Sequence, residues 1–200
     1  MLSAFARAFY ATLIAAVSMA VAAEPELGAL VDLYKDFHAH PELSLKETRS
    51  ASRIAERFRA AGLTVTEGVG GHGVVGVLKN GAGPTVLIRG DMDALPVTEK
   101  TGLDYASEVT VLRDDGTTAG VMHACGHDVH MTVLVGTVER LARTADAWRG
   151  TLVAIAQPAE EIGAGARAML ADGLFRRFPR PDYNLALHVS SDMAAGTLGY

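Results

Sequence analysis

Three short runs of mostly apolar residues place the strongest constraint on how this chain can fold. They span residues 85–89, 151–156 and 183–189, and each is too short to be an ordinary helix. Nearly continuous apolar runs of this length are typical of strands that are covered on both faces, as in parallel sheets. We therefore expect three buried strands that belong to one sheet.

Helical patterns alternate with these runs. Apolar residues recur at the three- and four-residue spacing of a helix in four stretches: residues 27–37, 45–61, 128–143 and 164–171. Pro41, Gly62 and Gly173 follow three of them as stop signals. The alternation predicts an α/β domain, a layered sheet with helices on both faces.

Two local patterns concern the first half of the chain. Asn80-Gly81 lies between two apolar stretches and predicts a hairpin that joins a strand near residues 74–78 to the strand at 85–89. Residues 71–76 match the dinucleotide pattern G-x-G-x-x-G, but they lead into a predicted strand and turn. A dinucleotide site needs a helix at that point, so we do not expect nucleotide binding.

The first 23 residues have the layout of a secretory signal peptide. Arg7 precedes an apolar run from Ala8 to Ala23, which ends in small residues. The alternative is a membrane anchor, but the run of about 16 residues is short against the roughly 20 that a stable span needs. We expect cleavage near Ala23, export to the periplasm, no stable membrane anchor, and a domain that covers residues 24–200.

Charge and composition exclude one class of partner. The net charge is −5 and no basic stripe is visible, which argues against a nucleic-acid binder held by phosphate contacts. Apolar residues make up 49% of the chain, enough for a packed core.

Polar residues follow each of the three apolar runs. Asp91 and Asp93 follow the first run, Glu160 and Glu161 follow the second, and His188 lies near the end of the third. Sites in open α/β sheets form just beyond the carboxyl ends of the strands. These side chains can therefore converge on one point.

The stretch MHACGHDVH, residues 122–130, is the densest group of potential metal ligands. It holds three of the seven histidines and the only cysteine, and it precedes a predicted helix. A single cysteine cannot form an internal disulfide, and its thiolate is a strong ligand for zinc-like metals. Together with the strand-end residues, the stretch predicts a divalent metal site.

A hydrolase also needs a carboxylate that binds no metal and accepts the proton of the attacking water. The adjacent Glu160 and Glu161 can divide these two roles, and Asp91 and Asp93 have the spacing to face one side of a strand. Each feature alone has an ordinary alternative, such as a solvated turn for Asp-x-Asp or a core position for His188. A metal-dependent phosphoesterase would also suit the cluster. We interpret His38 and His40 as capping or surface residues, and His72 as part of a loop.

Five motifs, taken in order and spacing, resemble the M20 family of aminoacylase- and carboxypeptidase-like metallopeptidases. They are HAHPELSLKE, RGDMDALPVTE, MHACGHDVH, QPAEE and ALHV. The amidohydrolase subfamily is the most similar branch, with its hippurate hydrolases, N-acyl-amino-acid amidohydrolases and plant auxin-conjugate hydrolases. The resemblance implies a zinc-peptidase-like catalytic domain that hydrolyses the amide bond of N-acyl amino acids or dipeptide-like substrates.

The resemblance also implies a role for each matching residue. It places metal ligands at Cys125, His127, Glu161 and His188, the general base at Glu160, the orienting aspartate at Asp93, and supporting residues at Asp91, His123, Asp128 and His130. It implies two divalent ions, with zinc, manganese, cobalt or nickel as candidates.

Members of the family are longer than this chain. In them a lid and dimerisation domain interrupts the catalytic domain, which then resumes and supplies a last histidine ligand. Residues 24–200 resemble the part that precedes this insertion, so the domain through which relatives dimerise is absent from this sequence. A non-catalytic metal-binding fragment is therefore the alternative to an active hydrolase.

Overall fold

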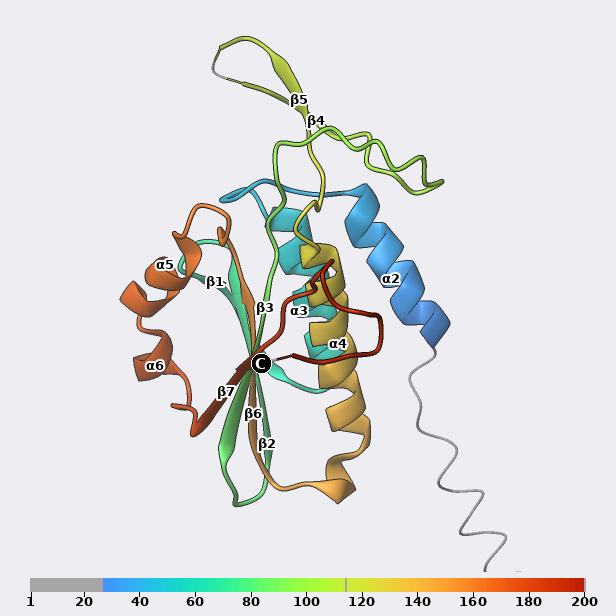
Figure 1. The fold of residues 1–200 in the computed structure, drawn as a ribbon. Helices are drawn as coiled ribbons and strands as arrows, with labels where there is room; N and C mark the ends of the chain where they lie inside the picture. Colours follow the sequence, from blue (N-terminus) through green and yellow to red (C-terminus); the bar gives the residue numbers. More distant parts are fainter. Residues whose placement is uncertain (1–26, 114, 200) are drawn as a thin grey trace, which may run out of the picture.

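The computed structural model describes residues 27–113 and 115–199 (Figure 1). The predicted signal peptide, residues 1–23, lies outside this part of the chain, and its cleavage and the predicted export stay predictions. Within the described residues, none of the helices has the length and apolar character needed to cross a bilayer.

In the described part of the chain, two helices are followed by five consecutive strands, and helices and strands alternate after them. The helices are α2 (Leu27–Ala39), α3 (Thr48–Ala60), α4 (His127–Arg143), the 3-10 turn η1 (Ala145–Ala147), α5 (Gly165–Ala171) and α6 (Leu174–Arg177). The strands are β1 (Thr64–Val69), β2 (Gly73–Asn80), β3 (Thr85–Asp91), β4 (Thr110–Leu112), β5 (Thr118–Gly120), β6 (Gly150–Gln157) and β7 (Tyr183–Ala186).

Five strands form one mixed sheet in the order β1-β2-β6-β3-β7. Strand β3 pairs in parallel with both β6 and β7, whereas β2 pairs antiparallel with β1 and β6. Because β3, β6 and β7 are parallel, their carboxyl ends meet at one edge of the sheet. The segments that follow them are the ones from which the sequence predicts a site.

Helices cover both faces of the sheet (Figure 1), which confirms the predicted α/β layers. One core lies under α2, α3 and α4, with Phe37, Phe58 and Met131 fully buried. A smaller core lies on the opposite face, where Met169 of α5 and Leu174 pack against β6. These two cores fix the orientation of the sheet edge that carries the polar segments.

The predicted hairpin between β2 and β3 is wrong. The chain does turn at Gly81, which has a φ of +81°, but β6 lies between the two strands and pairs with both. The connecting residues cross the start of β6, where the Thr151 amide donates to the Pro84 carbonyl at 3.0 Å. The long-range pairing of an apolar strand therefore replaces the local pairing that the turn favours.

The third strand, predicted as buried over residues 183–189, differs in two respects. Strand β7 ends at Ala186, so His188 lies in the irregular segment that follows, and all four strand residues are exposed. Among the described elements β7 pairs with β3 alone and forms an edge of the sheet. The apolar composition of the run therefore predicted a strand correctly, but it did not predict that the strand is exposed.

Two smaller differences concern segment boundaries and a hairpin. Helix α3 begins at Thr48, three residues after the predicted start, because Leu45 has a φ of +69° that a helix cannot contain. Strands β4 and β5 form a separate small hairpin that projects from the domain, with Gly116 in its turn. Residues 71–76 lead into β2, as the interpretation of the glycine pattern expects.

Candidate metal centre

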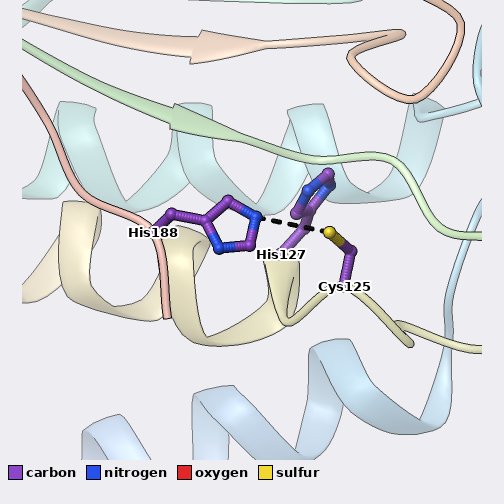
Figure 2. Close-up of side chains that lie close together, drawn as sticks. All are labelled: Cys125, His127 and His188. Atoms are coloured by element: carbon purple, nitrogen blue, oxygen red, sulfur yellow. Dashed lines mark hydrogen bonds between the residues drawn. The ribbon is translucent and has the colours of Figure 1, made fainter. Parts of the chain in front are cut away.

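Two segments of the chain bring three potential ligands together at the carboxyl edge of the parallel strands (Figure 2). Cys125 comes from the loop before α4, His127 is the first residue of α4, and His188 lies beyond β7. Their Sγ and ring nitrogen atoms lie within 4.8 Å of one another. Figure 2 shows the three side chains directed toward one point.

His127 presents one ring nitrogen to this point. Its side chain is fully buried, and its Nδ1 donates to the main-chain carbonyl of Asp93 at 2.8 Å. This bond fixes the proton on Nδ1, so Nε2 carries the lone pair. Among the described residues, Nε2 has no hydrogen-bond partner. A buried nitrogen with a free lone pair is the state that a metal ligand requires.

His188 has the same arrangement on the exposed side. Its Nδ1 donates to the carbonyl of Val189 at 2.6 Å, and its Nε2 lies 3.3 Å from Sγ of Cys125. The thiol can therefore donate to Nε2 in the absence of a cation. Gly126 makes this approach possible, because a Cβ at its position would lie 2.4 Å from the Val189 side chain and its φ is +82°.

The pair Glu160 and Glu161 also lies close to His127. Nε2 of His127 is 3.8 Å from Oε2 of Glu160 and 3.8 Å from Oε1 of Glu161. The Glu161 side chain is mostly buried, and its Oε1 lacks a hydrogen-bond partner within the described part of the chain. The Glu160 side chain is 40% exposed, so solvent reaches it. The adjacent carboxylates thus have one buried member and one that faces water.

A tight turn holds the pair. Ala159 is fully buried with a φ of +49°, a left-handed conformation that costs a residue other than glycine about 1 to 3 kcal/mol. Its carbonyl accepts the amides of Ala164 and Gly165, both at 3.0 Å. Gly165 is required here, because a Cβ would lie 1.5 Å from the carbonyl oxygen of Pro158. The surrounding structure therefore holds this turn in a single shape.

Asp93 connects the turn to α4. Its Oδ2 accepts the Ser44 hydroxyl at 2.6 Å and the Glu161 amide at 2.9 Å, and its Oδ1 lies 3.4 Å from Nδ1 of His127. Burial alone would raise the pKa of Asp93, but the hydrogen bonds from His127, Ser44 and the turn amides outweigh it and lower this pKa to about 2. Asp93 is therefore an ionised carboxylate that orients the groups around it.

The charges of the cluster favour a divalent cation. Burial raises the pKa of the Cys125 thiol to about 11, and the neighbouring Glu161 and Glu160 add to this effect. Without a cation the thiol stays protonated among carboxylates. A divalent ion reverses this balance, because it stabilises the thiolate and the carboxylates together. The donor set of one thiolate, two imidazoles and carboxylates fits such an ion.

Asp91 and His130 lie behind these groups. Oδ1 of Asp91 accepts from Nδ1 of His130 at 2.6 Å and lies 3.6 Å from Nε2 of His127. Arg89 forms an ion pair with the same carboxylate at 2.7 Å. Nε2 of His130 in turn accepts the Val189 amide at 3.0 Å, so it tethers the segment that carries His188.

His123 and Asp128, the two remaining predicted residues, are both buried, and neither belongs to the groups of potential ligands around His127 among the described residues. Burial lowers the pKa of His123 to about 4, so its ring is neutral. Oδ2 of Asp128 accepts from Nδ1 of His38 at 2.6 Å, and Nε2 of His38 donates to Glu99 at 3.0 Å. The interpretation of His38 as a capping or surface residue is therefore wrong. His40, in contrast, is half-exposed and donates to the Asp36 carbonyl near the end of α2.

Sequence reasoning missed the roles of Ser44, Glu47 and Glu99, all of which carry buried or nearly buried polar contacts. Ser44 and Glu47 lie in the motif HAHPELSLKE, for which the sequence alone predicts no function. A groove of about 640 Å³ lies beside the cluster, between α4, β7 and the segment after it, and most of its lining is apolar. His130 and His188 form part of its wall.

Comparisons with known proteins identify relatives of this chain. The model of peptidase family M20/M25/M40 matches residues 87–200. Thermostable carboxypeptidase 1 of Saccharolobus solfataricus is 39% identical over 171 residues, which cover 84% of this chain and 40% of that protein. The hippurate hydrolase of Campylobacter jejuni is 40% identical over 162 residues, which cover 80% and 39%.

A solved structure shares the fold. It is a dinuclear metal-binding peptidase of the M20 family from Bacillus subtilis, with a TM-score of 0.72 and 34% identity, and the match covers 82% of this chain and 43% of that one. The chain thus spans about 40% of the length of the relatives it matches. Since the family model covers more than half of the residues and the relatives extend the match toward the N-terminus, this chain belongs to peptidase family M20.

Proposed function

We propose that this protein takes part in the metal-dependent hydrolysis of an amide bond. One observation carries the proposal: the free Nε2 of buried His127 lies 3.8 Å from both Glu160 and Glu161, and the ligand atoms of Cys125 and His188 lie within 4.8 Å of a ring nitrogen of the same histidine. Ligands and a water-facing carboxylate therefore lie around the same side chain. The names of the relatives, a carboxypeptidase and a hippurate hydrolase, support amide chemistry.

Cys125, His127, Glu161 and His188 would hold the metal. The Bacillus subtilis relative, described as dinuclear, supports two ions in the site. We propose that the Cys125 thiolate contacts both of them. Zinc suits the sulfur and nitrogen donors, while manganese, cobalt and nickel remain candidates. When bound, such ions polarise the substrate carbonyl and make water more acidic.

The chain's own residues would carry the proton. Glu160 would accept a proton from the attacking water on its carboxylate and then donate it to the nitrogen of the leaving amine. The carbonyl carbon gains the water oxygen and loses the nitrogen, so a carboxylic acid and an amine result. Asp93 keeps the Nδ1 side of His127 and the Glu161 amide in place throughout.

N-acyl amino acids or dipeptide-like amides are the proposed substrates. The apolar groove beside His188 supports this choice, because its volume of about 640 Å³ and its lining suit an acyl or aromatic group. The acidic cluster itself would repel a substrate carboxylate, so that group has to bind away from Glu160 and Glu161.

The test uses the 200-residue chain loaded with Zn²⁺ or Mn²⁺ and a substrate panel. We expect turnover of hippurate or other N-acyl amino acids and none of 4-nitrophenyl phosphate. Turnover of the phosphate ester alone would establish the phosphoesterase alternative. Metal binding without turnover of any substrate would establish the non-catalytic fragment.

The role of Glu160 has its own variant. Glu160→Ala should abolish amide turnover and retain the bound metal, because the side chain moves a proton and does not hold the ion. Metal content is measured by mass spectrometry of the dialysed protein. An equal loss of metal and of activity removes Glu160 from the role of base.

We also propose export to the periplasm, which the signal-like layout of residues 1–23 supports. The intact mass of the native protein from its source cell tests it. A mass that lacks the first 23 residues indicates cleavage, and retention of all of them contradicts the proposal. Dimerisation through the further domain of longer family members stays a prediction.

A further inference from the structure

The motif HAHPELSLKE contains a buried acid that the proposed reaction does not use. Glu47 lies just before α3, and none of its surface is exposed. Its Oε1 accepts the main-chain amide of Ala159 at 2.7 Å, across 112 residues of sequence. Buried carboxyl groups are rare unless they serve a specific contact, and here the contact is with the turn that carries Glu160 and Glu161.

The contact falls on the strained residue of that turn. Ala159 has a φ of +49° and is followed directly by the two glutamates. A residue in the left-handed region persists only where its surroundings hold it there. The amide of Ala159 lies on the N-terminal side of the pair, so the bond from Glu47 fixes the direction in which the chain enters Glu160.

A second acid holds the other side of the same turn. Oδ2 of Asp93 accepts the Glu161 amide at 2.9 Å and the hydroxyl of Ser44 at 2.6 Å. Ser44 and Glu47 come from the same short segment, so this segment contacts the turn directly through Glu47 and indirectly through Asp93. The backbone on either side of Glu160 is thereby held at two points.

We propose that Glu47 is a positioning residue, which sets the placement of Glu160 and Glu161 through its hydrogen bond to the Ala159 amide. The inference rests on the proposed function, because it gives Glu47 a role only if Glu161 binds metal and Glu160 moves a proton. It assigns a function to the first of the five sequence motifs.

This role requires a side chain long enough to place an acceptor oxygen at the Ala159 amide. It does not require a negative charge. Burial raises the pKa of the Glu47 carboxyl, and the nearby Asp93 adds to the effect. Its second oxygen, Oε2, has no hydrogen-bond partner among residues 27–113 and 115–199. A glutamine has the same length and an equivalent carbonyl oxygen, whereas an aspartate keeps the charge and is one methylene shorter.

The experiment compares Glu47→Gln, Glu47→Asp and Glu47→Met in the full chain. Co²⁺ alone is titrated into each variant by calorimetry, and the visible and near-ultraviolet spectra of the cobalt protein report the ligand geometry. Glu56→Gln on the exposed side of α3 is the matched control. Circular dichroism verifies that each variant is folded.

We expect Glu47→Gln to bind Co²⁺ like the wild type, with the same spectrum. Glu47→Asp and Glu47→Met should bind about 10- to 100-fold more weakly, the loss typical of residues that orient a ligand. Their visible bands should change because Glu161 is displaced, while the thiolate-to-cobalt band from Cys125 remains. If Glu47→Met fails to fold, the comparison of Gln with Asp alone decides.

Two results overturn the inference. If Glu47→Asp binds Co²⁺ more tightly than Glu47→Gln, the charge matters and not the reach to Ala159. If all variants match a wild type that binds cobalt, Glu47 is only structural and the metal centre stands without it. A wild type that binds no Co²⁺ removes the metal centre and, with it, the role of Glu47.

Discussion

The inner and outer sides of the metal centre are built in different ways. On the inner side, Asp93 and His127 are at most 1% exposed; Asp93 follows β3, and His127 is the first residue of α4. On the outer side, His188 follows an edge strand whose residues are all exposed, and Glu160 faces solvent. The inner groups are fixed by packing and buried hydrogen bonds, whereas the outer groups depend on a few bonds at the rim.

This difference separates two consequences of substitution. A change on the inner side should reduce both the stability of the fold and the binding of metal. A change on the outer side should leave the stability of the fold unchanged, whether or not it reduces metal binding. The following variants test that separation, in order of decreasing expected effect.

Asp93→Ala should have the largest effect. It leaves the Ser44 hydroxyl and the Glu161 amide without their buried acceptor, at about 1 to 3 kcal/mol for each unsatisfied group. It should also abolish tight metal binding. Urea denaturation and Co²⁺ calorimetry measure the two effects, with the exposed Asp192→Ala as control. Full metal affinity in Asp93→Ala would show that the inner side does not orient the site.

His38→Gln tests the inner side through pH. Burial alone would lower the pKa of His38, but the bonds to Glu99 and Asp128 outweigh it and raise this pKa above its ordinary value of 6.5. A raised pKa means that the ion pairs stabilise the fold fully below pH 6.5 and less as the pH rises through the folded-state value. The variant should lose about 1.5 to 3 kcal/mol at pH 6 and progressively less at higher pH.

Urea denaturation at several pH values between 6 and 9 measures this dependence. The half-exposed His40→Gln is the control and should change the free energy of unfolding by less than about 0.5 kcal/mol. A wild type and a His38→Gln variant with the same pH dependence would mean that His38 is not charged between its two carboxylates.

Cys125→Ser should separate metal binding from stability. Cys125 is partly exposed, so the free energy of unfolding should change by less than about 0.5 kcal/mol. The affinity for Zn²⁺ should fall at least about tenfold, since a hydroxyl replaces a thiolate ligand. A chelator competition assay measures the affinity. Unchanged metal content would leave Cys125 with a structural role only.

Two leucines of the sheet form the last comparison. One should give the smallest effect on stability, and the other should give a large one. Leu185 on β7 is 58% exposed, and Leu185→Ala should change stability by less than about 0.5 kcal/mol. Leu152 on β6 is buried in the larger core, and Leu152→Ala should cost about 2 to 5 kcal/mol. Similar losses for the two variants would mean that the edge at β7 is covered in solution.

The sequence predicted the layered fold and the convergence of the polar segments because both follow from short-range patterns. The parallel strands β3, β6 and β7 have apolar runs that are visible locally, and their carboxyl ends must meet at one edge. Asp91 and Asp93 do face His127 from the same segment, as their two-residue spacing indicates.

The errors at the hairpin and at His38 share one physical origin, which is pairing between residues far apart in the chain. The Asn80-Gly81 turn is a local signal, and the strand that separates β2 from β3 begins at Gly150. His38 was interpreted as a surface residue because its partners, Glu99 and Asp128, are 61 and 90 residues away. Glu47 and Ala159 are separated even further, and no local pattern predicts that contact.

The central place of β6 sets the order in which this sheet can be completed during synthesis. Strands β2 and β3 are complete once the ribosome has synthesised residue 91. Strand β6, which lies between them in the sheet, is complete only at Gln157. At about 5 to 20 residues per second, several seconds pass before that strand is available. Until then two apolar strands expose unpaired edges, so the nascent chain is most exposed to aggregation, and most dependent on chaperones, in that interval.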